Sequence, residues 1–327
     1  MLANREMSRN VITIATSKKL YIDMAVNLAR SFIWWNKDLD ITFYIVTDHA
    51  ELIPDDIRQQ IKTIVIKPGE LGEGFSSKLH LDLLAPPGQT LFIDSDCLIF
   101  GPLTELFERF KGKSVSVLGN YVSDGEWFGD IKKICKDFNI QRMPKFNGGI
   151  YYLEKGETAD QVYQTAREIE QKYDEIGFQR LRNRPNDEVI MSLAMQLHGM
   201  EPLIDDGTVM SDPQACPGGY HIDVLNGKRW LLNPPAPHRL HQDWHPFARV
   251  EPLVVHFLGT YTEHYPYKRE VYLLEKALKD ELGWMEKIKA KLIIEYPPRL
   301  TAAFKDMFRS TYHRLFGARK VKVSNRI

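Results

Sequence analysis

Two aspartates follow an apolar run at a spacing that suits one shared cation. Asp94 and Asp96 come directly after residues 90–93, which read as a buried strand. Residues i and i+2 of an extended segment point to the same side, so both carboxylates can face one ion. Oxygen ligands of this kind suit Mg²⁺ or Mn²⁺ rather than zinc. Asp38 and Asp40 share the spacing but precede a strand, where a solvated loop is the simpler interpretation; for the first pair, turn capping is the alternative.

A histidine ends another apolar run. His256 lies in residues 253–257, which read as a strand. A histidine in such a strand is usually a core residue whose ring nitrogens are hydrogen-bonded. If this strand ends near the aspartate pair, a neutral imidazole completes a site of oxygen and nitrogen ligands, and Mn²⁺ becomes the favoured metal.

Two further motifs permit either a structural or a functional interpretation. Asn147, Gly148 and Gly149 precede residues 150–153, which read as a strand. The glycines fit a plain tight turn or a close approach of the backbone to a ligand. In the second motif, Asn186 has the character of a helix N-cap and the two acids after it complement the helix dipole. Capping alone explains this motif, and a role in a site is the alternative.

Strands and helices alternate around these residues. Apolar runs predict strands at residues 11–15, 41–46, 61–66, 90–93, 150–153 and 253–257, and helical spacing predicts helices near 21–36, 78–84, 158–173 and 186–198. This order predicts a largely parallel sheet covered on both faces, with ligands bound beyond the carboxyl ends of the strands. Residues 205–249 form a long irregular stretch rich in aromatic residues. We expect an ordered loop that faces the substrate, with disorder as the alternative.

Charge is balanced overall but unevenly distributed. The 327 residues carry 43 Lys and Arg against 43 Asp and Glu, which argues against a general nucleic-acid binder. From residue 286 onward, however, eleven basic residues face three acidic ones. Within this tail, residues 299–317 (Arg299 to Gly317) read as a basic amphipathic helix that Gly317 ends. Its two interpretations are docking on an anionic membrane surface and packing on the rest of the protein.

The cysteines and the amino terminus suggest a compartment. Cys97, Cys135 and Cys216 are odd in number and lack zinc-like spacing, which indicates neither a disulfide framework nor a zinc site. Residues 1–10 lack the apolar run of a secretory signal, and no later run is long enough for a membrane span. We expect a cytoplasmic protein, or one that lies on the inner face of a membrane.

The order of these motifs resembles the GT-A glycosyltransferases of family 8, the type of glycogenin and of bacterial lipooligosaccharide galactosyltransferases. The resemblance covers about residues 10–260 and rests on Thr16 and Tyr21, Lys78-Leu79, Asp94-Ser95-Asp96, Phe146 to Ile150, Asn186-Asp187-Glu188 and His256 to Gly259. It implies an α/β fold of the GT-A (Rossmann-like) kind, whose mostly parallel central sheet is flanked by helices. We therefore expect a catalytic domain over residues 1–265 and a helical C-terminal extension over residues 266–327.

The resemblance also implies an activity. A hexose would move from a nucleotide-sugar, with a UDP-sugar favoured, to a glycan, lipid-linked or protein acceptor, with retention of configuration. Asp94, Asp96 and His256 would hold Mn²⁺ or Mg²⁺. Asp187 and Asn147 would be catalytic, with Asp187 a candidate for stabilising an oxocarbenium-like centre. The donor would be contacted by Thr16, Tyr21, Lys78, Asp94, Ser95, Gly148 and Gly259, with Tyr21 stacked on the base.

The sequence departs from the family pattern at two places. Thr262 stands where the family usually has a lysine on the diphosphate, and residues 16–19 replace a first turn that commonly carries a base-reading Asp. Two alternatives remain open. One is a phosphotransferase of the haloacid dehalogenase type, in which Asp94 attacks a phosphate, Asp96 is acid and base, and Asp205 and Asp206 form the later acidic pair. The other is a catalytically silent module that binds nucleotide-sugars.

Overall fold

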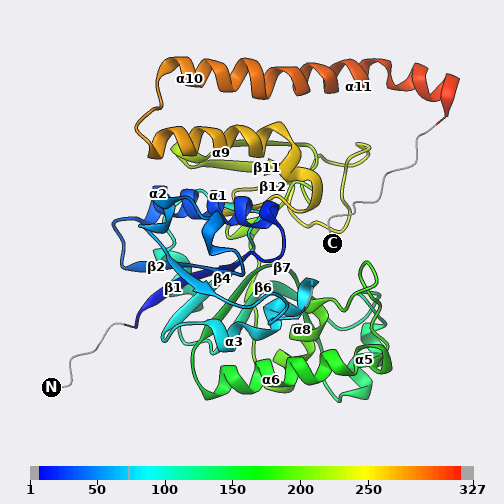
Figure 1. The fold of residues 1–327 in the computed structure, drawn as a ribbon. Coiled ribbons are helices and arrows are strands. Elements are labelled where there is room, and N and C mark those ends of the chain that lie inside the picture. The colour runs from blue at the N-terminus through cyan, green and yellow to red at the C-terminus, as the bar shows by residue number, and fades with distance from the viewer. Residues whose placement is uncertain (1–6, 73, 318–327) are drawn as a thin grey trace.

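A seven-stranded sheet forms the centre of the protein (Figure 1). The computed structural model describes residues 7–72 and 74–317. The strand order is β3-β2-β1-β4-β7-β6-β8. The strands are β1 Arg9–Ile14, β2 Ile41–Thr47, β3 Lys62–Val65, β4 Gln89–Ile93, β6 Val115–Val122, β7 Met143–Glu154 and β8 Leu203–Ile204.

The sheet is mostly parallel, as the sequence predicts. Strands β3, β2, β1 and β4 pair in parallel, and so do β6 and β8, whereas β7 runs antiparallel to both of its neighbours. One predicted boundary is wrong, because β7 begins at Met143 and not after Gly149. Asn147, Gly148 and Gly149 therefore lie inside a strand, and the tight-turn interpretation of this motif fails.

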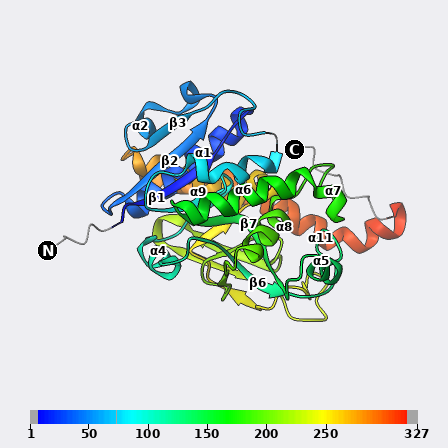
Figure 2. The ribbon, with the colours of Figure 1, turned by 90° about the horizontal axis from the view of Figure 1, so that it is seen from below.

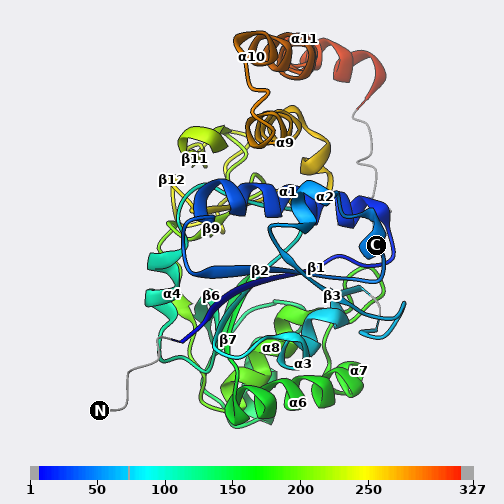
Figure 3. The same cartoon turned by 60° about the vertical axis from the view of Figure 1, so that its left-hand side comes forward.

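Helices cover both faces of the sheet, on two separate cores (Figure 3). On one face, α1 packs over alternate strand residues such as Val11 and Leu91. On the other face, α6 and α8 pack over Ile12 and Phe92, as the view from below shows with α6 in front and α9 behind (Figure 2). The sheet helices are α1 Lys19–Asn36, α2 Asp55–Arg58, α3 Leu81–Leu84, α4 Thr104–Phe110, α5 Ile131–Asp137, α6 Glu157–Gln171, α7 Tyr173–Ile176 and α8 Asp187–Leu197. The strand β6 and the helices α4 and α5 lie in a stretch where no element was predicted.

The second part of the chain adds two small sheets beside α1. In one, β5 Cys97–Ile99 and β9 Met210–Ser211 flank β13 Val254–His256. In the other, β10 Gly219–Asp223, β11 Lys228–Leu232 and β12 Arg249–Val250 pair antiparallel. Residues 205–249 are therefore largely ordered, and their apolar side chains share a third core with the helix α9, Tyr265–Leu278. Cys97, Cys135 and Cys216 are buried thiols.

The described chain ends in a helical rod that lies beyond α9 (Figures 1 and 3). It consists of α10 Trp284–Lys289, a π-helical turn Ala290–Glu295 and α11 Tyr296–Phe316. Gly317 caps it with a positive φ of 72°, so the helix end predicted at this glycine is confirmed. Within residues 7–72 and 74–317, no helix has both the length and the apolar character needed to cross a bilayer.

Candidate active site

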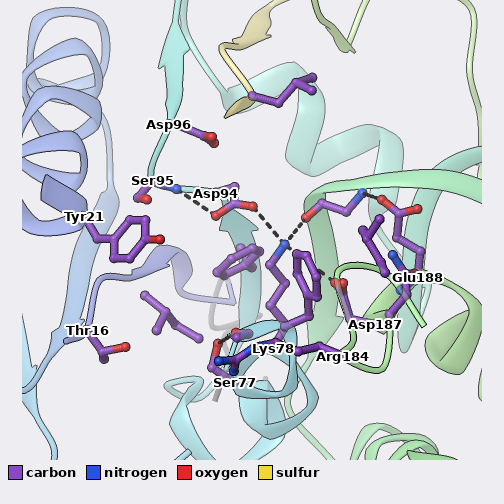
Figure 4. A pocket seen from close by; sticks show the side chains of 18 of the residues that line it. Thr16, Tyr21, Ser77, Lys78, Asp94, Ser95, Asp96, Arg184, Asp187 and Glu188 are labelled. Atoms are coloured by element: carbon purple, nitrogen blue, oxygen red, sulfur yellow. Dashed lines mark hydrogen bonds and ion pairs between the residues drawn. The ribbon is translucent and has the colours of Figure 1, made fainter. Parts of the chain in front are cut away.

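The predicted site residues converge on one pocket at the carboxyl edge of the central sheet (Figure 4). The pocket has a volume of about 600 Å³ and lies where α/β sheets bind their ligands, beyond the ends of β1 and β4. It is lined by Thr16, Tyr21, Lys78, Asp94, Ser95, Asp96, Asn147, Gly148, Asp187, His256 and Gly259. These residues come from six separate parts of the chain, so the tertiary structure brings together what the sequence only places in order.

Asp96 and His256 form the part of the pocket that best fits a metal. β13 pairs with β5, with His256 opposite Cys97, and the Phe257 N–H donates to the Asp96 carbonyl at 2.9 Å. This pairing places His256 Nε2 2.9 Å from Asp96 Oδ1. Burial on its own lowers the pKa of His256, but the Asp96 carboxylate raises it to about 9. Attraction to the imidazolium likewise outweighs burial at Asp96 and lowers the pKa of that carboxyl.

The donor atoms of this pair suit a divalent cation. Asp96 Oδ1 is buried and accepts no hydrogen bond from any other group of the described residues; its neighbour is His256 Nε2 at 2.9 Å. A buried carboxylate oxygen is costly unless a cation satisfies it; the His256 imidazolium is one such cation, and a metal ion bound between the two side chains would be another. The Cys97 thiol lies within 4.8 Å of both ligand atoms, but burial raises its pKa well above the usual value. One oxygen and one imidazole nitrogen therefore remain as the available ligands, a set that fits a divalent cation.

Asn147 orients the histidine. Asn147 Oδ1 lies 2.9 Å from His256 Nδ1 and also accepts a hydrogen bond from the Gly149 N–H at 3.1 Å. With Nδ1–H donating to this amide oxygen, Nε2 faces Asp96, and a metal bound there would take the place of the Nε2 proton. Metal-binding histidines are commonly fixed in this way through their second nitrogen.

The two glycines of the motif make room for side chains of the pocket. A Cβ atom at Gly148 would lie 3.0 Å from Asp187 Oδ2, and one at Gly149 would lie 2.8 Å from His256 Nδ1. Gly148 and Gly149 are both described by the structure, and neither has a positive φ. Close approach to neighbouring side chains is therefore the reason for glycine at both positions; the close approach to a ligand that the sequence suggested stays a prediction.

Lys78 is a buried cation at the centre of the pocket. Its Nζ donates to Asp94 Oδ2 at 2.8 Å and to the Gly148 carbonyl at 2.9 Å, and lies 3.6 Å from Asp187 Oδ2. Only 8% of the residue is exposed. Burial alone lowers the pKa of Lys78, but Asp187 and Asp94 outweigh burial and raise it above the usual value. Asp94 thus pairs with Lys78 (Figure 4), and it is not part of the candidate metal group of Asp96, Cys97 and His256.

Asp187 begins the helix α8 and faces the pocket from the side opposite Tyr21 (Figure 4). The Tyr151 hydroxyl donates a hydrogen bond to its Oδ2. Burial raises the pKa of Asp187 despite the nearby Lys78, and burial together with Asp187 raises the pKa of Glu188 to about 7. Glu188 Oε1 accepts from the Gly148 N–H at 2.8 Å. The predicted N-cap is confirmed, because Asn186 Oδ1 accepts from the N–H groups of residues 188 and 189.

The first turn forms the other wall of the pocket. Tyr21 lies on α1, with Lys18 Nζ 5.7 Å from the centre of its ring. Ser17 has a positive φ of 70°, and its N–H donates to Asp48 Oδ1 at 3.0 Å. Asp48, directly after β2, thus places a carboxylate beside this first turn.

Several residues of the site were missed or misplaced by the sequence reasoning. Tyr151 was not singled out, although it shares a strand face with Gly149 and so had a detectable signal. Arg182 and Arg184 also line the pocket, from the turn before α8. Residues 205–249 contribute nothing to its lining, so the stretch expected to face the substrate does not face this pocket. Its Trp230 instead stacks on His221, with ring centroids 3.7 Å apart.

The acidic pair of the phosphotransferase alternative lies elsewhere. Asp206 pairs with Arg109 at 3.0 Å, and Asp205 accepts from the Gly207 N–H. Neither residue lines the pocket that holds Asp94 and Asp96. The structure therefore does not assemble the two acidic pairs that this mechanism needs.

The fold is shared with glycosyltransferases. A mutant of LgtC, a galactosyltransferase, matches with a TM-score of 0.50 at 15% identity, over 76% of this chain and 87% of the other. GlyE of Streptococcus pneumoniae (TM-score 0.39, 16% identity, 60% and 44% covered) and mouse xyloside xylosyltransferase 1 (0.41, 14%, 62% and 87%) match more loosely. No protein-family model matches the sequence, and the search of curated sequences gives no match. The likeness to LgtC establishes a GT-A architecture.

Proposed function

We propose that this protein is a metal-dependent glycosyltransferase that moves a hexose from a nucleotide-sugar, with a UDP-sugar favoured, to a glycan, lipid-linked or protein acceptor. One observation carries the proposal. On a GT-A architecture, a single pocket joins the Asp96 and His256 pair to the ion-paired group of Lys78, Asp94 and Asp187. A cation site beside a second charged group is what departure of a diphosphate from a sugar requires.

The metal would be held by Asp96 and His256, and we propose Asp94 as the third ligand, through the carboxylate oxygen Oδ1 that does not accept from Lys78 Nζ. When bound, Mn²⁺ or Mg²⁺ would neutralise the charge that develops on the departing diphosphate. Asn147 keeps His256 Nε2 turned towards Asp96. Lys78 adds a fixed positive charge next to Asp94, so the pocket keeps a cation aimed at its centre in addition to the metal site.

Asp187 is the group that we propose for stabilising the sugar. During transfer, the bond between the anomeric carbon and the diphosphate oxygen breaks as the acceptor oxygen bonds to that carbon, the acceptor's hydroxyl proton passes to the departing diphosphate, and positive charge builds up on the ring. A buried carboxylate held by Tyr151 and Lys78 is oriented before the reaction and opposes that charge. We propose retention of configuration for this step.

The donor base is assigned to the wall formed by the first turn. Tyr21 offers an aromatic face for stacking, and Thr16, Ser95, Gly148 and Gly259 line the space between this wall and Lys78. We assign the catalytic role to residues 1–265 and a separate role to residues 266–327. The further partner that we propose is an anionic membrane surface, contacted by the helix over residues 299–317.

The test is nucleotide release from a panel of UDP- and GDP-sugars, first with Mn²⁺ and then with EDTA. Slow hydrolysis of the donor needs no acceptor. We expect release from one donor that EDTA abolishes and that Asp96→Asn lowers at least about 100-fold, as loss of a charge-stabilising group at a reaction centre does. Asp40→Asn is the matched control, because Asp40 is exposed and has the same i, i+2 spacing to Asp38. Release that is insensitive to Asp96→Asn, or phosphomonoester hydrolysis in its place, refutes the proposal. Donor binding without turnover in the presence of acceptors would favour the silent module.

A further inference from the structure

The terminal rod carries a large apolar surface that no part of the described chain covers. Along α11, six large apolar side chains are between 47% and 73% exposed: Leu300, Phe304, Met307, Phe308, Leu315 and Phe316. The exposed surface continues into α10 and the π-helical turn through Trp284, Met285, Ile288, Leu292 and Ile293. Apolar surface of this extent on a folded protein usually marks a site of contact.

One side of the rod is fixed to the body by ion pairs. Glu295 is buried and pairs with Arg269 of α9 at 2.8 Å, and Arg269 in turn donates to the Ile222 carbonyl of β10 at 2.7 Å. Further along, Asp306 pairs with Arg239 at 3.2 Å. Glu295 and Asp306 therefore mark the side of the rod that faces the protein.

Four of the six apolar side chains of α11 lie on the side away from Asp306, and Met307 and Phe316 lie nearer its flanks, about 100° and 80° from Asp306. A helix turns by about 100° per residue, so residues two apart point about 160° away from each other. Phe304 and Phe308 are each two residues from Asp306, and Leu315, nine residues away, is again about 180° from it. The apolar stripe therefore faces away from the body, so its exposure does not result from incomplete packing of the rod against the protein.

Basic side chains border this stripe. Lys305 and Arg314 lie about 100° and 80° from Asp306 in opposite directions, which places them on the two edges of the stripe. Between residues 284 and 317 the chain has seven Lys or Arg against three Asp or Glu. Two copies of such a helix would bring like charges together, whereas an anionic surface complements them. An apolar stripe with basic edges is the pattern of helices that lie in the plane of a membrane interface.

We propose that the whole rod, residues 284–316, is an in-plane anchor whose apolar stripe inserts into the interface of an anionic bilayer. The Glu295–Arg269 and Asp306–Arg239 pairs hold its polar side on the body, so the stripe is presented outward before any lipid is met. This extends the membrane contact proposed for residues 299–317 to α10 and assigns the inserting face. It does not depend on glycosyl transfer.

The experiment is flotation of the full chain with vesicles of phosphatidylglycerol and phosphatidylcholine, compared with phosphatidylcholine alone. It is done in EDTA without a nucleotide-sugar, so a failed transferase assay leaves its result unaffected. We expect binding to the anionic vesicles and at least about tenfold weaker binding for Phe304→Glu, because an inserted aromatic ring is lost. Ser310→Glu is the matched control, since Ser310 is exposed, lies about 40° from Asp306 and adds the same charge to the side that faces the body.

Two further readouts identify the edges and the extent of the stripe. Lys305→Gln and Arg314→Gln are each expected to weaken binding to anionic vesicles about fivefold. Lipids that carry a nitroxide at a shallow depth are expected to quench the fluorescence of Trp284. The contribution of this residue is obtained by subtracting the fluorescence of Trp284→Phe from that of the wild type. The donor-hydrolysis rate of Phe304→Glu in solution should equal that of the wild type.

Three results would overturn this inference. One is equal binding to neutral and anionic vesicles, and another is equal loss of binding in Phe304→Glu and Ser310→Glu. The third is a wild-type particle with twice the chain mass that becomes a monomer in Phe304→Glu, because a second copy would then cover the stripe.

Discussion

Replacing Gly149 with alanine should damage the metal site from within the sheet. The added Cβ would lie 2.7 Å from Met210 Sδ and 2.8 Å from His256 Nδ1, both far inside normal contact. The methionine side chain is flexible and can move aside. The imidazole can move only by losing its contacts with Asn147 and Asp96. We therefore expect the histidine to be displaced.

The magnitude follows from two separate effects. Overpacking of a filled interior costs about 1–3 kcal/mol of stability without metal. Loss of the group that orients a metal ligand costs about 10- to 100-fold in metal affinity. With Mn²⁺ at about 100 times the wild-type Kd, the metal adds about 2.7 kcal/mol to the stability of the wild type. After a tenfold loss of affinity, the same concentration adds only about 1.4 kcal/mol.

The assay is urea unfolding of both proteins, once in EDTA and once at that fixed Mn²⁺ concentration. The unfolding curves in EDTA measure the stability lost to overpacking at residue 149. The difference in the free energy of unfolding between Mn²⁺ and EDTA measures the stabilisation by the metal. Gly156→Ala is the control, because a Cβ there meets nothing within 4 Å and Gly156 does not line the pocket. If Gly149→Ala loses stability in EDTA but gains as much from Mn²⁺ as the wild type, His256 is not displaced and the reasoning is refuted.

Two other predictions concern buried charges. In urea unfolding, Lys78→Ala should cost about 3–5 kcal/mol of stability, because it leaves Asp94 and Asp187 without their buried cation. The control is Lys19→Ala, which breaks an exposed pair with Asp23 and should cost about 0.5 kcal/mol or less. Equal losses of stability in the two variants would contradict the central role of Lys78. Burial raises the pKa of Glu270 from 4.5 to about 7 despite Arg269, so its folded form binds a proton more tightly and its contribution to stability falls as pH rises from about 4.5 to 7. As pH rises from about 4.5 to 7, the free energy of unfolding of Glu270→Gln should therefore increase relative to that of the wild type by up to about 3 kcal/mol. The measurement is urea unfolding of both proteins at a series of pH values. Free energies of unfolding that change in parallel with pH would contradict the raised pKa of Glu270.

Features that depend on neighbouring residues were available from the sequence. The aspartates at i and i+2 after a buried strand predicted two carboxylates at the pocket, and apolar periodicity with Gly317 predicted the end of α11. Asn186 was recognisable as an N-cap. Each of these rests on geometry within a few residues of one strand or helix, which sequence spacing records directly.

Features that depend on distant pairing were decided only by the tertiary structure. The register of β13 against β5 sets His256 beside Asp96 across some 160 residues of sequence, and Asp94 turned out to be paired with Lys78. The motif Asn147-Gly148-Gly149 looked like the entrance to a strand, but its pairing with distant residues made it part of β7. The outward direction of the stripe on α11 likewise follows from the Asp306–Arg239 pair. Strand register and the seating of a helix are long-range choices, and local spacing does not record which distant segment each face will meet.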